Sequence, residues 1–130
     1  MRLFSVLLLI VLTLLPLQAQ RDIETSITAA LSKGDAIALS SLFNDHVELV
    51  LTGINDVYSK KQATGILVDF FRKNKVATYQ LLHKGTKENS AFTIGTITTS
   101  TGDYRVYILI RRSSVDKQLI QQLRIESSND

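Results

Sequence analysis

Carboxylates are the first residues to consider for catalysis, because the chain contains no cysteine and offers neither a thiol nucleophile nor a thiolate metal ligand. Acid–base catalysis requires carboxylates that lie close together or in apolar surroundings. Of the 12 acidic residues, most fall at predicted helix caps, turns, solvent-facing helix positions or the C-terminal tail. Only Glu48 and Glu126 lie on predicted strands, and neither has an acidic neighbour nearby in sequence. The sequence therefore predicts no catalytic carboxylate pair.

The two histidines give little support for catalysis or metal binding. His46 and Glu48 share one face of a predicted strand, about 7 Å apart, and a solvated strand face is the simpler interpretation of this pair. His83 ends a strand beside Lys84, which indicates a surface position. Two separate histidines without cysteine do not form a zinc site. The chain also has no glycine-rich phosphate loop and no Gly-x-Ser-x-Gly motif. We therefore expect no metal, no cofactor and no catalytic residue.

The first 19 residues have the layout of a secretory signal peptide. Met1-Arg2 is a short positive start, residues 3–15 are almost entirely apolar, and Ala19 provides a small residue at the cleavage position. The apolar run would span only about 20 Å as a helix, whereas a bilayer core is about 30 Å thick, which argues against a membrane anchor. We predict cleavage after Ala19 and a soluble mature protein in the periplasm or outside the cell.

Residues 20–130 are predicted to form a single domain. The whole chain is 45% hydrophobic, which excludes a disordered protein, and its net charge is +3. The basic pairs are dispersed over a helix start, a helix end and a strand end, as on a solvated surface of mixed charge: Lys60-Lys61, Arg72-Lys73 and Arg111-Arg112. Together with the predicted export, this dispersion argues against a nucleic-acid partner.

Three helices are predicted in the first part of the domain. Asp22 caps a helix that stops at Gly34, and Asp35 caps a short second helix that ends at Asn44-Asp45 and places inward Ile37, Ala38, Leu42 and Phe43. The third helix has the clearest signal, a capping box from Ser59 to Gln62. Behind it, one apolar stripe runs from Lys60 to Asn74 and consists of Ala63, Ile66, Leu67, Phe70 and Phe71.

The rest of the domain alternates with the period of strands. One strand covers His46–Leu51, and a short one contains Val57-Tyr58. Four further runs are separated by short polar turns, which predicts consecutive antiparallel hairpins over Val76–His83, Ser90–Thr98, Tyr104–Arg112 and Gln118–Glu126. Helices followed by a meander predict an α+β domain in which N-terminal helices pack on a curved antiparallel sheet.

Several strands are apolar on both faces, although the helices can cover only one. A second apolar face predicts self-association, and we assign to a homodimer face the residues Tyr79, Leu81, Ile97, Tyr107, Leu109 and Ile120. On the helix-covered face, polar groups among apolar ones are what a small-molecule pocket needs, although satisfied core polar groups are equally consistent. The candidate ligand-binding residues there are Gln80, Thr96, Tyr104 and Gln121.

Several segments together resemble a secreted bacterial family of uncharacterised proteins, domain of unknown function 4783. The segments are Val57-Tyr58-Ser59-Lys60, Gln62-Ala63, Asp69-Phe70-Phe71, Ile94-Gly95, Gly102, Arg105-Val106-Tyr107 and Gln122-Leu123-Arg124-Ile125-Glu126. The family looks like a branch of the nuclear-transport-factor-2-like (cystatin-like) superfamily, in which a curved sheet wraps around helices to form a cone. That superfamily includes ketosteroid-isomerase-like enzymes and many non-catalytic domains, so the resemblance implies the fold and export and leaves the activity open.

The expected function is that of an exported, non-catalytic domain that binds a small apolar ligand or a partner protein through its cone or sheet face. One alternative is an enzyme of isomerase, dehydratase or hydrolase type that uses His46, Glu48 or Tyr104 inside the cone. Another is a module for dimerisation or assembly alone. A deep pocket, a filled cone or a large apolar sheet face would separate these hypotheses.

Overall fold

The computed structural model describes residues 22–113 and 116–129. The predicted leader and its cleavage site lie outside these residues. In the described part of the chain, no helix combines the length and the apolar composition that crossing a bilayer requires.

The helices begin and end at the residues whose side chains can cap them. α2 (Ile23–Lys33) is capped by Asp22, which accepts from the backbone N–H of Glu24, and it ends at Gly34 in the left-handed region with φ 61°. In α4 (Lys60–Lys73), Ser59 and Gln62 form the predicted capping box.

The short helix differs from its prediction. α3 (Ala36–Ser40) is capped by Asp35, as expected, but it ends before Phe43, which already belongs to a strand. The side chain of Ile37 is 63% exposed, and the residues that α3 buries are Ala36, Leu39 and Ser40. The inward placement of Ile37 and Ala38 was wrong, because the helix is too short to carry the longer pattern that was read across it, whereas Leu42 packs against the core as predicted.

Six strands form one sheet in the order β2-β1-β6-β5-β4-β3. The strands are β1 (Phe43–Leu51), β2 (Ile54–Ser59), β3 (Val76–Lys87), β4 (Ser90–Thr99), β5 (Gly102–Arg112) and β6 (Gln118–Ser127). The antiparallel hairpins predicted from β3 to β6 are confirmed. The sheet is mixed rather than wholly antiparallel, because β1 pairs with β6 in parallel. The α+β class is confirmed.

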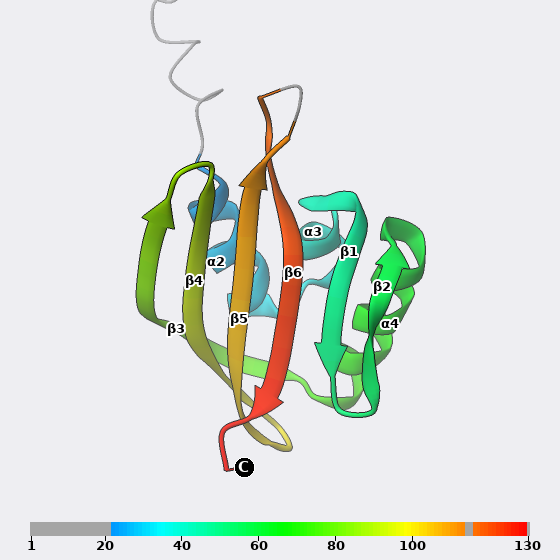
Figure 1. The fold of residues 1–130 in the computed structure, drawn as a ribbon. Coiled ribbons are helices and arrows are strands. Elements are labelled where there is room, and N and C mark those ends of the chain that lie inside the picture. The colour runs from blue at the N-terminus through cyan, green and yellow to red at the C-terminus, as the bar shows by residue number, and fades with distance from the viewer. Residues whose placement is uncertain (1–21, 114–115, 130) are drawn as a thin grey trace, which may run out of the picture.

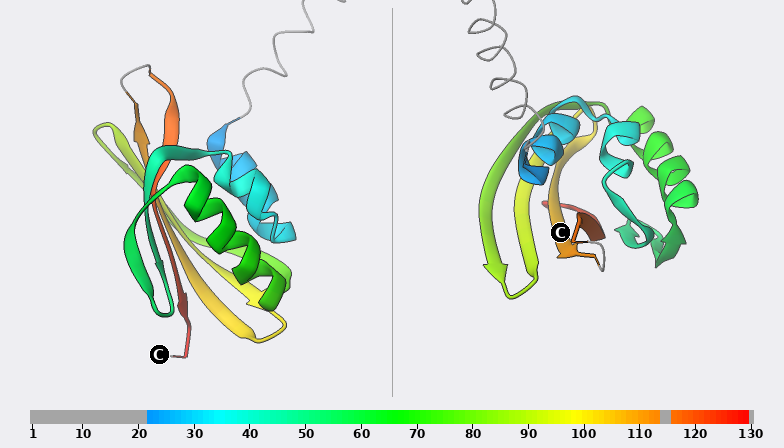
Figure 2. Two further views of the ribbon diagram at one scale, coloured as in Figure 1. Left: turned by 90° about the vertical axis from the view of Figure 1, so that its right-hand side faces the viewer. Right: turned by 90° about the horizontal axis from the view of Figure 1, so that it is seen from above.

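The sheet is curved, and all three described helices lie on its concave face (Figures 1 and 2). α2 contacts β3 near one edge, whereas α4 contacts β1 and β2 near the other. The core lies between these layers, and its largest fully buried side chains are Phe43, Ile27, Leu31, Leu39, Leu49, Leu67, Ile97, Ile108, Ile110, Ile120, Leu123 and Ile125. The convex face carries no helix of the described residues.

Two strands show their side chains on the opposite faces to those predicted. In β4 the buried residues include Ile97, so Ile97 faces the helices and Thr96 faces the convex side. β3 follows the same pairing, with Tyr79 opposite Ile97 and Gln80 opposite Thr96. Alternation within a strand was read correctly, but the face was assigned one residue out of step, which exchanges the two sets of side chains.

A β-bulge explains the remaining change of face. Ile110 pairs with Ile120 but Leu109 pairs with Gln122, so Gln121 is an extra residue in β6. Ile120 and Leu123 are therefore both fully buried, although strict alternation places them on opposite faces. This bulge removes Ile120 from the predicted outer face.

Candidate functional site

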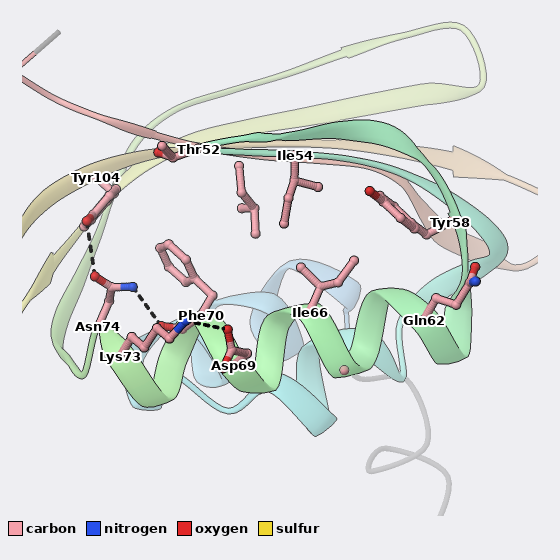
Figure 3. A pocket seen from close by; sticks show the side chains of 12 residues that line it. Thr52, Ile54, Tyr58, Gln62, Ile66, Asp69, Phe70, Lys73, Asn74 and Tyr104 are labelled. Atoms are coloured by element: carbon pink, nitrogen blue, oxygen red, sulfur yellow. Dashed lines mark hydrogen bonds and ion pairs between the residues drawn. The ribbon is translucent and has the colours of Figure 1, made fainter.

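A groove of about 840 Å³ lies between α4 and the β1–β2 hairpin (Figure 3). This volume is in the range of small-molecule pockets. Its lining consists of Leu51, Thr52, Ile54, Tyr58, Gln62, Gly65, Ile66, Asp69, Phe70, Lys73, Asn74 and Tyr104.

The floor of the groove is one side of α4. Gln62, Ile66, Phe70 and Lys73 recur at helical spacing, so they form a row along the helix that is about 16 Å long. The neighbouring row, which contains Leu67, is buried against the core. Ile66 and Phe70 are only half-buried, because they lie at the border of the contact between α4 and the sheet.

The β1–β2 hairpin forms the opposite wall. Leu51 pairs with Ile54 across the hairpin. Tyr58 comes four residues after Ile54, so it lies on the same face of β2. Gly53 makes the connecting turn with a φ of 77°, a conformation that favours glycine. Figure 3 shows Ile54 directed towards Ile66 of α4, and the Tyr58 ring beside it along the groove, with its hydroxyl end towards Ile54. The middle of the groove is therefore apolar on both sides.

One end of the groove is closed by a hydrogen-bonded polar cluster. The Oδ1 atom of Asn74 accepts from the Tyr104 hydroxyl at 3.2 Å and from the Thr101 hydroxyl. The Nδ2 atom of Asn74 donates to the backbone carbonyl of Phe70 at 2.9 Å. The Tyr104 ring also contacts the Phe70 ring edge-to-face, with centroids 5.4 Å apart. These contacts hold Tyr104 in a fixed position at this end of the groove.

The charged groups of the groove form ion pairs at its rim. Lys73 Nζ lies 3.1 Å from Asp69 Oδ2, and Arg72 also pairs with this carboxylate. The hydrogen bond from Lys73, reinforced by its charge and by Arg72, lowers the pKa of the Asp69 carboxyl below its ordinary value. A carboxylate with a lowered pKa is a weaker base than a free one, so Asp69 is poorly suited to removing a proton from a substrate.

A smaller depression of about 380 Å³ lies between α2 and the strands β3 and β4. Tyr79 and Leu81 line it, together with residues of α2 such as Ile27. Burial raises the pKa of the Tyr79 hydroxyl, and the nearby carboxylate of Glu24 acts in the same direction. Glu24 itself forms an ion pair with Lys84 at 3.2 Å, which links α2 to β3.

Of the four predicted ligand-binding residues, the structure places only Tyr104 in the groove. Gln80 is exposed, and Thr96 pairs with Arg105 on the convex side. Gln121 accepts a hydrogen bond from Asn44 Nδ2 at 3.2 Å, so it behaves as a satisfied polar group beside the bulge. The structure does not bring these four side chains together.

The six residues predicted for a dimer face are also divided. Tyr107 and Leu109 are half-buried on the convex face, as predicted. Tyr79 and Leu81 instead lie beside α2, and the last two residues are fully buried in the core: Ile97 and Ile120. The assignment of all six to one outer face was wrong, because β3 and β4 were read one residue out of step and β6 contains the bulge.

The residues of the alternative enzymatic hypothesis lie on opposite sides of the sheet. Val47 and Leu49 are buried towards the helices, so Glu48 between them points to the convex side. His46 is exposed and does not line the groove that contains Tyr104. Across residues 22–113 and 116–129, no three histidine or acidic side chains gather as metal ligands.

Most of the groove was missed by the sequence analysis. Ile66 and Phe70 were identified, but as core residues of one apolar stripe, and Ile54 was not singled out. The available signal was the width of that stripe, since five apolar residues on a helix of 14 residues cover more surface than the neighbouring strands bury. Polar residues at helical spacing along its border, such as Gln62 and Asp69, mark the edge of the groove.

The comparisons with known proteins agree with this architecture. The model of the family described as "Domain of unknown function (DUF4783)" matches residues 24–126. A solved DUF4783 family protein of Bacteroides fragilis is 34% identical, with 82% of this chain and 100% of that chain covered and a TM-score of 0.76. Among curated proteins, none matches this chain.

More distant structures share the fold alone. An uncharacterised protein of Silicibacter pomeroyi with a cystatin-like fold is 12% identical, with a TM-score of 0.59 over 84% of this chain and 75% of that one. A hypothetical protein of Catenulispora acidiphila with a ketosteroid isomerase-like fold, solved in complex with trimethylamine, is 15% identical, with a TM-score of 0.61 over 82% of this chain and 85% of that one. These likenesses confirm the predicted nuclear-transport-factor-2-like, cystatin-like fold.

Proposed function

The chain belongs to the DUF4783 family, and from that premise we propose that it is an exported binding domain whose groove holds a small, largely apolar molecule. The observation that carries this proposal is the groove of about 840 Å³. In it, Ile54 of the hairpin faces Ile66 and Phe70 of α4, and all three side chains are half-buried. A ligand that covers apolar side chains in a concave site removes them from water, and this burial favours binding.

The groups at the groove favour binding over catalysis. Asp69 is tied to Lys73 and Arg72, and its pKa is lowered rather than raised. The Tyr104 hydroxyl is hydrogen-bonded to Asn74, which fits a role in orienting a ligand. An acid–base enzyme needs a group whose pKa is shifted towards neutrality and directed at the substrate.

Replacement of Ile66 by glutamate tests this proposal. Ile66→Glu places a carboxylate in the apolar middle of the groove, where covering it with an apolar ligand removes its hydration. We expect the affinity for N-phenyl-1-naphthylamine, an uncharged apolar dye, to fall at least about tenfold. Fluorescence titration of the purified protein measures the change.

Val68→Glu is the matched control. Val68 lies on the same helix, is 43% exposed and does not line the groove, so the same substitution should leave the dye affinity within about twofold. Equal loss in both variants, or dye binding that neither variant weakens, contradicts a ligand site in the groove.

A second proposal is that two copies associate through the convex face, which would make the protein a homodimer. The observation that favours it is a row of half-buried aromatic rings with no helix over it: Phe92 stacks near Tyr107, with centroids 6.3 Å apart. A depression beside Tyr107 carries both Arg124 and Glu126, so the face holds charges of both signs. Arg124 and Glu126 pair with each other within the chain at 3.5 Å, so the face is charge-balanced and two copies can meet there without like-charge repulsion.

Tyr107→Asp tests the association. This substitution places a charge in the aromatic row, and we expect it to weaken self-association at least about tenfold, as seen by light scattering over a range of protein concentrations. Ile37→Asp is the control, because Ile37 is an exposed apolar residue of α3 on the other layer. A wild-type protein that remains monomeric at high concentration contradicts the dimer. A dimer that binds no apolar dye would instead support a module for assembly alone.

Export is part of the proposal and is supported by the leader pattern of residues 1–19. Mass spectrometry of the protein isolated from its producing cell should find Gln20 as the first residue. An intact Met1 would contradict cleavage.

A further inference from the structure

The polar end of the groove indicates what kind of ligand it accepts, an inference that rests on the function proposed above. Asn74 and Tyr104 line the groove, and Thr101 supports them from the turn between β4 and β5. The direction of each hydrogen bond in this cluster follows from counting hydrogens, since a hydroxyl has only one to donate.

Both hydroxyl hydrogens of the cluster are already used. Thr101 and Tyr104 each donate to Oδ1 of Asn74. Thr99, next in the network, gives its hydroxyl hydrogen to the Gly102 carbonyl at 2.8 Å. The Thr101 and Tyr104 oxygens lie 3.1 Å apart, and either hydroxyl could donate to the other, so Tyr104 has a hydrogen-bond acceptor for its hydrogen in Asn74 or in Thr101. The Tyr104 oxygen therefore keeps its capacity to accept a hydrogen bond from a ligand.

The amide of Asn74 supplies the complementary donor. One hydrogen of Nδ2 goes to the Phe70 carbonyl. The other has no acceptor among the residues that the structure describes, and Asn74 lines the groove. This end of the groove thus offers one donor and one acceptor side by side.

A hydroxyl group matches this pair. It donates one hydrogen, here to the Tyr104 oxygen, and accepts another, here from Asn74. An ether or ketone can only accept, and a primary amide brings a second N–H that would lose its hydration without a partner. An ionised carboxylate can only accept, so it has no hydrogen to give to the Tyr104 oxygen of this pair.

We propose that the natural ligand is an uncharged molecule with a hydroxyl group at one end, bound by Asn74 and Tyr104. Its apolar body lies between α4 and the β1–β2 hairpin, against Ile54, Ile66 and Phe70. The row of α4 residues that lines the groove, about 16 Å long, has room for an extended chain. The donor–acceptor pair at the end of the groove and the apolar side chains along it select together for an alcohol with an apolar body.

Competition between matched probes tests this selection. n-Decanol, decyl methyl ether and decanoate share one apolar chain and differ in the end group, and each is titrated against the bound neutral dye at neutral pH. We expect the alcohol to bind about three- to tenfold tighter than the ether, the gain of one hydrogen bond. We expect decanoate to bind more weakly than the alcohol, since its charge must leave water without a free partner.

Tyr104→Phe provides the second measurement. This variant keeps the ring that contacts Phe70 and removes only the hydroxyl oxygen. We expect the ratio of alcohol affinity to ether affinity to fall to about one. Thermal unfolding verifies that the variant remains folded, and Ile66→Glu shows that each probe occupies the groove.

The outcomes separate the two proposals. Equal affinities for alcohol and ether, with a ratio that Tyr104→Phe does not change, overturn the alcohol assignment but leave the apolar ligand site intact. Tighter binding of decanoate likewise overturns it in favour of an anionic ligand. If neither the dye nor any of the three probes binds, both the alcohol assignment and the proposed function are wrong.

Discussion

Phe43→Ala should lower the free energy of unfolding by about 3–5 kcal/mol. Phe43 is 1% exposed and opens β1, where it pairs with Ile120 of β6. The backbone N–H of Ile120 donates to the carbonyl of Leu42 at 2.8 Å, which holds the two strands together at this point. Removing the ring leaves a cavity that close-packed neighbours fill only in part. Urea unfolding followed by circular dichroism measures the loss.

Phe92→Ala is the matched control for this prediction. Phe92 is a phenylalanine of the same sheet, but it is half-buried on the convex face, where its ring lies 5.6 Å from that of His83. Since the Phe92 ring is already partly in contact with water, its loss should cost less than that of Phe43, about 1–1.5 kcal/mol. Equal costs for Phe43 and Phe92 would contradict the placement of the core on the concave side.

Gly95→Val should destabilise the protein by about 2–3 kcal/mol through overpacking. Gly95 is buried in β4, and the ring of Tyr79 from β3 covers it diagonally. A Cβ atom at Gly95 would lie 2.6 Å from Oη and 2.7 Å from Cζ of Tyr79. The ring cannot move aside freely, because it packs against the core.

A double-mutant cycle shows whether this contact is the cause. Tyr79→Ala removes the ring, so Gly95→Val should cost at least about 1.5 kcal/mol less in that background than in the wild type. Additive losses would mean that the effect of Gly95→Val comes from elsewhere. Gly65→Val controls for the loss of a glycine in general, since a Cβ atom at Gly65 meets nothing within 4 Å.

Local signals in the sequence were sufficient for the helices. A capping box depends on residues three apart, so the start of α4 at Ser59 could be predicted without knowledge of the fold. The same holds for Asp22 and Gly34 at the two ends of α2. The end of α3 was predicted too late, because no local signal shows that β1 already begins at Phe43.

The faces of the strands depend on distant partners. Tyr104–Arg112 was read with the correct alternation, but whether Thr96 or Ile97 shares a face with Tyr104 is decided by the pairing of β4 with β5. The bulge at Gln121 likewise appears only when β6 is aligned against β5. A shift of one residue in register exchanges the side chains of the concave and convex faces. Both the predicted ligand-binding residues and the predicted dimer face were therefore partly wrong.

The walls of the groove could not be assigned from the sequence for a related reason, although the wide apolar stripe of α4 was a signal for its floor. Its walls come from α4, the β1–β2 hairpin and β5, and only their packing shows that Ile66 and Phe70 remain partly uncovered. Tyr104 was found because its polar group lies on an apolar strand face. Asn74, which hydrogen-bonds to it, follows the end of α4 and had no signal of its own.

The parallel contact between β1 and β6 determines when the groove can form during folding. Asn44 and Gln121, which join these strands, are 77 residues apart in the chain, so the contact order of this seam is high and its formation is slow. The β1–β2 hairpin is local and can form early, but it lacks its neighbour in the sheet until β6 pairs with β1. Since β2 and β5 lie on opposite sides of the seam, the groove between them is completed only when the last strand is in place.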